Sequence, residues 1–235
     1  MVPNSLIHQE LKKRFNRVTS NGNESVNTEE WDSYFNEAYR YWVKIRVPMS
    51  KTNNKVRYDL RKLEVIDKPI DITNKKDTWV IAKLPEDYYD IQRIVPVASK
   101  KACKEHRELM VSMIQGNDWS ETMRDPFWKP SFLWARTIAD ENSEGLRVGK
   151  AKDFEIIKVS IDYYRTPAPI YSPELSDCEY TGPLKLLGNK NQGFELGEMQ
   201  MDEVADLAVS FACRDTGNLA DAQSMFEKVV NLYKL

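Results

Sequence analysis

The spacing of apolar residues changes twice along this chain. Near both ends they recur every three or four residues, the period of an amphipathic α-helix, whereas between about residues 55 and 170 they alternate with polar residues as in a β-strand. Helices from the two ends can bury their apolar faces by packing against each other. The pattern therefore predicts an α+β fold, with a helical bundle built from residues 1–50 and 198–235, an inserted antiparallel β domain at residues 51–170, and an irregular connection at residues 171–197.

The strongest helix signals lie between Asn27 and Pro48. Asn27 with Glu30 three residues later is typical of a capping box, and we expect Pro48 to end the helix. Near the C-terminus, apolar faces at residues 201–211 and 222–233 are separated by Gly217, which suits the left-handed conformation that ends many helices. The short link between them predicts an antiparallel pair.

Alternation predicts the strands of the central region. Val56, Tyr58 and Leu60 alternate with charged residues, which indicates a half-buried strand. Further strands are expected at residues 70–72, 79–82, 89–97, 109–114, 132–138 and 154–164.

Composition argues against several classes of protein. The 235 residues hold 34 basic and 36 acidic side chains, and a net charge of −2 disfavours a nucleic-acid binder held by bulk charge. The motifs of nucleotide loops, serine hydrolases, zinc peptidases and calcium loops are missing, and Cys103 and His106 would point to opposite faces of a strand. No apolar stretch reaches the length of a membrane helix. We therefore expect no enzyme, no catalytic or metal-binding residue, no cofactor and no membrane contact.

Three segments are candidates for interaction. Residues 44–68 carry eight basic and three acidic side chains, which indicates either a solvated face or contact with a polyanion or an acidic surface. An acidic cluster surrounds the start of the helix near residue 200, where negative charge favours the helix dipole; a metal site is the alternative. Residues 125–134, DPFWKPSFLW, predict either a loop that plugs the core or a set of rigid aromatic anchors.

The order of several segments resembles the head-to-tail adaptor proteins of short-tailed bacteriophages, especially the crAss-like phages. The segments are NTEEWDSYFNEAYRYWVKIR, LPEDYYDIQRIVPV, DPFWKPS, DYYRTPAPI and MDEVADLAVSFACRDTGN. The resemblance implies a virion structural protein made in the bacterial cytoplasm and placed at the head-to-tail junction. Such adaptors form a twelve-copy ring that docks on the portal protein and extends the channel for packaged DNA, without sequence-specific DNA contact.

The resemblance also implies sites. The last helix would dock on the portal, through Met225, Phe226, Val229 and Tyr233. A closed ring needs two different complementary surfaces on each subunit. For these we expect basic, acidic and aromatic side chains, namely Lys55, Arg57, Arg61, Glu198, Asp202, Glu203, Phe127 and Trp128.

Other functions remain open from the sequence. The chain could form another tail or hub ring lower in the connector stack, with other tail ring proteins as neighbours. A nucleic-acid-binding module that uses the basic segment is a second alternative. A third, from a different class, is an enzyme that holds a divalent metal between Glu198 and Asp206.

Overall fold

The computed structural model describes residues 2–18, 26–100, 105–172 and 193–231, and it confirms the α+β fold with helices at both termini flanking the β region. The chain divides into two compact units. The helical unit comprises Met1–Leu63 and Pro167–Leu235, and the β unit comprises Glu64–Thr166. The expected boundaries at residues 51 and 170 thus lie at residues 63 and 166, because residues 54–60 fold as a helix of the first unit.

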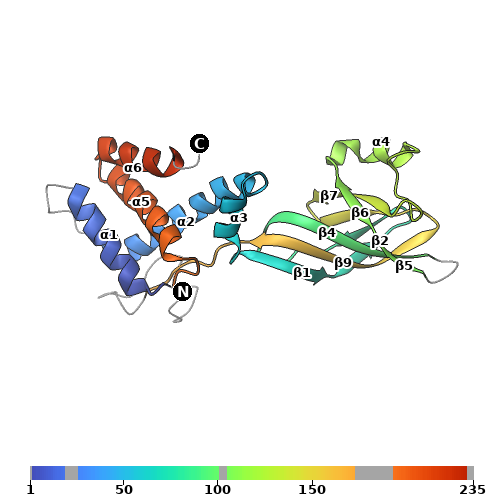
Figure 1. Cartoon of the computed structure of the whole chain (residues 1–235), viewed down its shortest axis with the longest axis horizontal. Coiled ribbons are helices and arrows are strands. Elements are labelled where there is room, and N and C mark those ends of the chain that lie inside the picture. Colours follow the sequence, from blue (N-terminus) through green and yellow to red (C-terminus); the bar gives the residue numbers. More distant parts are fainter. Residues whose placement is uncertain (1, 19–25, 101–104, 173–192, 232–235) are drawn as a thin grey trace. The chain divides into compact units, whose positions relative to one another are not determined.

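In the helical unit, α5 occupies the centre. It packs against α1, α2 and α6, and Figure 1 shows it between α1 and α2. Most of its residues from Met201 to Cys213 are buried. The helices of this unit are α1 (Asn4–Val18), α2 (Thr28–Ser50), α3 (Asn54–Leu60), α5 (Glu198–Asp215) and α6 (Leu219–Asn231).

Local signals explain where these helices start and stop. The Asn27 side chain accepts a hydrogen bond from the Glu30 backbone, and Glu30 accepts one from the Asn27 backbone, so the predicted capping box is confirmed. Gly217 has a φ of 86°, which confirms the expected left-handed residue after α5. The expected end at Pro48 is wrong by two residues, since α2 continues through Pro48 to Ser50.

The predicted strand at residues 56–60 is wrong, because these residues form α3. Val56 and Leu60 are four residues apart, so a short alternation of five residues fits a helical face equally well. Both are buried, and Leu63 continues the same face. Asn53 fixes the start of the helix, since its side chain accepts a hydrogen bond from the Lys55 backbone.

The β unit is a sandwich of two sheets. One has the strand order β1-β9-β4-β5 and the other β2-β3-β8-β7-β6. Their inner faces share one apolar core, to which residues such as Ile94, Val148 and Phe154 contribute. The strands are β1 (Glu64–Ile70), β2 (Ile72–Lys75), β3 (Trp79–Ala82), β4 (Tyr88–Lys100), β5 (His106–Glu108), β6 (Met110–Met113), β7 (Arg136–Asn142), β8 (Gly145–Gly149) and β9 (Phe154–Arg165).

Two details differ from the expected antiparallel domain. Among the strands described, β6 and β7 pair in parallel, while the other pairs are antiparallel. The strand expected at residues 132–138 starts only at Arg136, because Phe132 to Ala135 form a turn in which Ala135 has a φ of 47°. A short helix, α4 (Trp119–Arg124), follows a 3₁₀ turn at Gly116–Asp118.

Two side-chain contacts stabilise the sandwich. The Tyr163 hydroxyl donates a hydrogen bond of 2.8 Å to Asp87, and burial, followed by this carboxylate, raises the pKa of Tyr163 to about 12. On the outer side of β8, Arg147 pairs with Asp140 and lies 3.9 Å from the centre of the Trp119 ring. The second contact attaches the α4 segment to its sheet.

Candidate interaction surfaces

The outer side of α3 is strongly basic. Val56 and Leu60 face the core of the helical unit, so the opposite side of the helix is left open. Tyr58 lies on that side with 62% of its surface exposed, and the Arg61 guanidinium lies 4.2 Å from the centre of its ring. We define the α3 basic face by its exposed residues, Lys55, Arg57, Tyr58, Arg61 and Lys62.

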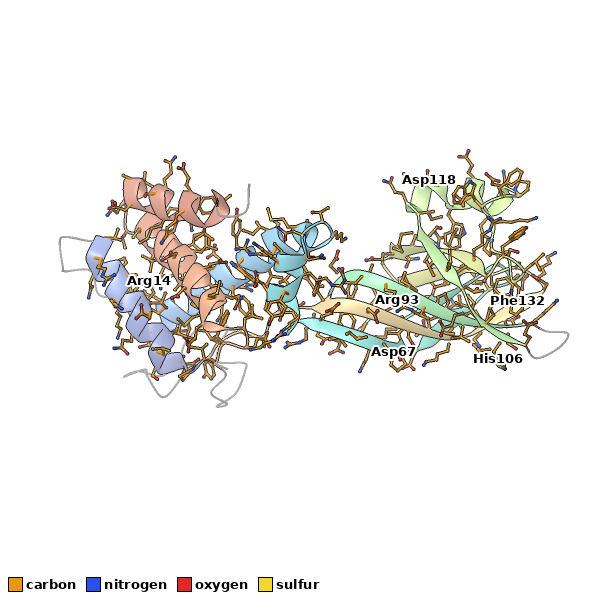
Figure 2. All side chains as sticks on the ribbon, viewed as in Figure 1. Arg14, Asp67, Arg93, His106, Asp118 and Phe132 are labelled. Atoms are coloured by element: carbon orange, nitrogen blue, oxygen red, sulfur yellow. The ribbon has the colours of Figure 1, made fainter. Side chains whose placement is uncertain are left out.

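The acidic cluster at the start of α5 is engaged within the chain. Arg14 of α1 (Figure 2) binds both Asp202 and Asp206, and Lys228 of α6 binds Asp206 at 2.8 Å. These contacts hold the flanking helices α1 and α6 to the central helix. The predicted subunit-contact residue Glu198 lies exposed at the start of α5.

Glu203 serves the interior of the bundle. Its carboxylate accepts hydrogen bonds from Trp42 Nε1 at 2.7 Å and from Arg46 at 2.5 Å. Arg46 is fully buried, and its guanidinium lies 4.8 Å from the centre of the Trp42 ring. The structure thus pairs Glu203 with Arg46 of the same chain.

The predicted portal-docking residues on α6 are largely packed inside. Val229 is only 1% exposed and belongs to the core. Phe226 is half-buried, with its ring 5.6 Å from that of Tyr41, and Met225 is also half-buried. Tyr233 lies outside the described residues. Docking through this helix stays a prediction. Of the three docking residues that the structure describes, Met225 and Phe226 have accessible parts that could take part, and Val229 is buried.

Four large apolar side chains are exposed in one short stretch of the β unit. Phe127 is 77% exposed, Trp128 58%, Leu133 77% and Trp134 70%. We call these four residues the aromatic tip. On monomeric soluble proteins, large exposed apolar patches usually mark interaction sites. The tip exposes four large apolar side chains within eight residues, so it is a candidate for contact with a partner.

Hydrogen bonds fix the backbone that carries the tip. The Asp125 side chain accepts from the Phe127 backbone, and the Asp125 carbonyl accepts from Lys129. Ser131 and Arg136 exchange two backbone hydrogen bonds that close the turn bearing Leu133 and Trp134. A rigid backbone lowers the entropy cost of binding through these side chains.

Phe132 anchors the same turn from below. Its side chain (Figure 2) is buried at the sandwich core with the ring 6.0 Å from that of Phe154. Arg107 donates hydrogen bonds to the carbonyls of Phe132 and Leu133. One of the two roles that the sequence suggested, a plug of the core, is thus present, and the other, an anchor for a partner, stays a prediction. Phe132 plugs the core, while Phe127 and Trp128 face outward. Leu133 and Trp134, which were not among the predicted contact residues, also face outward. Both lie in the segment DPFWKPSFLW that the sequence already singled out, and this was the available signal.

A buried polar cluster joins three parts of the helical unit. His8 Nε2 lies 2.8 Å from Asp32 Oδ1, and Asp32 also accepts hydrogen bonds from the Ser172 backbone and hydroxyl. The carboxylate stands between the imidazole and the hydroxyl, and all three side chains are buried. In a catalytic triad the imidazole lies between the carboxylate and the hydroxyl, so this order is not that of a triad, and the cluster ties α1, α2 and the segment at Ser172 together.

Other site types find no support in the part of the chain that the structure describes. No group of three or more His, Cys, Asp or Glu side chains there is arranged to hold a metal ion. His106 lies exposed on β5, and its sequence neighbour Cys103 lies outside the described residues. None of the helices described is long and apolar enough to cross a bilayer. Neither a scan of protein-family models nor a search of curated proteins gave a match to this chain.

Proposed function

We propose that this chain is a virion structural protein of a short-tailed bacteriophage. It forms a head-to-tail connector ring with copies of itself, docks on the portal protein and extends the channel through which the packaged DNA passes. The resemblance of its ordered segments to head-to-tail adaptors supports the family. The aromatic tip is the structural observation that carries the role of an assembly protein.

The argument from the tip is energetic. Burying a large apolar side chain in a contact stabilises that contact by about 1.5–3 kcal/mol. Four such side chains on a backbone held by hydrogen bonds match the aromatic anchors that dominate protein interfaces. An isolated protein gains nothing from exposing them, whereas a subunit of an assembly does.

The structure changes which residues we expect in the subunit contacts. Asp202 and Glu203 already pair with Arg14 and Arg46 of their own chain. We therefore place the main contact at the aromatic tip, including Phe127 and Trp128. Since a ring contact is heterologous, the tip must meet a different surface of the neighbouring copy or of the portal.

Native mass spectrometry of the chain mixed with the portal protein of the same genome tests the proposal. We expect a defined complex with about one copy per portal subunit, as a ring that continues the portal symmetry requires. The double variant Phe127→Ser, Trp128→Ser should lose this complex while keeping its fold. Ile66→Ser, which removes an exposed apolar side chain from β1 of the same unit, is the matched control and should retain it.

Two results would count against the first-ring role. If the folded chain binds no portal protein, it is not the ring that docks there, and binding to lower tail proteins would support the alternative of another tail or hub ring. If the complex forms but the tip variant binds as well as the control, the tip is not the contact.

A further inference from the structure

The α3 basic face has a defined geometry. At 100° per residue, the buried Val56 and Leu60 share one side of α3, and Tyr58 lies almost opposite them. Basic side chains flank Tyr58 on both sides along the helix. They are Lys55, Arg57, Arg61 and Lys62, all exposed.

The acidic residue of this stretch points away from the face. Residues 51–62 contain five basic side chains and one acidic side chain, Asp59. Asp59 is half-buried and accepts a hydrogen bond of 2.9 Å from Gln200 of α5, and burial raises its pKa. The carboxylate is thus directed toward the central helix, while the cations remain on the outside.

The chemistry of the face fits a phosphate backbone better than a protein surface. Arginine and tyrosine are common in protein interfaces, but lysine is depleted there and the contacts are built around buried apolar anchors. This face carries two exposed lysines, and its one tyrosine is already stacked with Arg61. A seven-residue helix is about 10 Å long. Duplex DNA of about that length carries roughly six phosphates, which is comparable to the number of cations in the stretch.

We infer that the α3 basic face binds the phosphate backbone of double-stranded DNA without reading its sequence. This inference goes beyond the proposed function, since it concerns the isolated chain and holds whether or not the chain forms a ring on the portal. Contacts of this kind are weak and strongly dependent on salt, which suits a surface that DNA must leave again.

Fluorescence anisotropy of a short labelled duplex, titrated with the full chain between about 50 and 200 mM salt, tests the inference. Each phosphate contact contributes about −0.9 to the slope of log affinity against log salt. The triple variant Lys55→Ala, Arg57→Ala, Arg61→Ala should lose at least about tenfold in affinity at the lowest salt and have a slope shallower by about 2 to 3. These side chains are exposed, so the fold should persist, as circular dichroism can verify.

A charge-matched control separates this surface from total charge. The variant Lys12→Ala, Lys13→Ala, Arg17→Ala removes the same charge from exposed positions of α1 and should bind DNA like the original chain. Arg57→Lys with Arg61→Lys keeps the charges on α3 and should retain the salt slope.

Three outcomes would overturn the inference. They are no measurable affinity for the duplex, an equal loss in the α1 and α3 variants, and unchanged DNA binding in the α3 variant. If the α3 variant instead loses binding to an acidic protein or to its own copies while duplex affinity is absent, the face is a protein contact. Portal binding is measured separately and should survive in the α3 variant, so failure here is distinct from failure of the proposed function.

Discussion

Replacing Trp42 by alanine tests whether the bundle is held together as the structure shows. Trp42 is fully buried, packs beside Arg46 and donates a hydrogen bond of 2.7 Å to Glu203. Removing a buried tryptophan side chain costs about 3–5 kcal/mol of unfolding free energy, since the cavity only partly closes. Trp42→Phe keeps most of the apolar contact and loses a hydrogen bond to a charged group, which costs about 1.5–3 kcal/mol. We therefore expect graded destabilisation, with alanine the more severe.

Urea unfolding followed by helical circular dichroism measures this grading. At an m-value of about 2 kcal/mol/M, Trp42→Ala should lower the midpoint by roughly 2 M, and Trp42→Phe by about half as much. Trp128→Ala removes the same type of side chain from an exposed position and should leave the midpoint unchanged. Equal midpoints for Trp42→Ala and the original chain would refute the reasoning, because they would mean that Trp42 is not in the core.

Three further predictions concern other contacts. Because the pKa of Tyr163 is raised in the folded state, the stability that its neutral form contributes is complete below about pH 10 and is lost as the pH rises toward about 12. In thermal melts, the melting temperature of Tyr163→Phe should therefore fall less between these pH values than that of the original chain. Asp206→Asn weakens the contacts between α5 and its two flanking helices and should cost about 1.5–3 kcal/mol in urea unfolding, whereas Glu198→Gln, at an exposed position, should cost little. Gly145→Ala should lower the melting temperature of the β unit, since Gly145 has a φ of 133° and an added Cβ would lie 2.5 Å from the Ala82 carbonyl oxygen. An unchanged melting temperature would contradict that geometry.

The helical unit could be predicted from sequence because its signals are local. The Asn27–Glu30 capping box and Gly217 act within one helical turn, and both have the expected conformation. The wrong prediction of a strand at residues 56–60 also has a local origin. An alternation of five residues cannot distinguish a strand from a helix whose buried positions are four apart. The exposed Tyr58 resolves this, since on a strand it would share the face of Val56 and Leu60.

The aromatic tip shows the limit of pattern reading in the β unit. Phe132, Leu133 and Trp134 are adjacent and equally apolar, yet Phe132 is buried and the other two are exposed. The difference comes from the turn closed by Ser131 and Arg136, which directs one ring toward the core. A turn of this kind replaces the first part of the expected strand, and the strand that follows it, β7, pairs in parallel with β6, which no local pattern encodes.

Charge requires the folded structure for a similar reason. Counting along the sequence suggested that Lys55, Arg57 and Arg61 and the acids near the start of α5 could be opposite surfaces of neighbouring subunits. Folding matches Asp202, Glu203 and Asp206 with cations that are distant in sequence, from α1, α2 and α6. The nearby Asp59 is directed toward α5, and the side chains of the α3 basic face are exposed in a chain whose total charge is close to zero. The net charge therefore argues only against binding by bulk attraction, and a local phosphate contact on α3 is compatible with it.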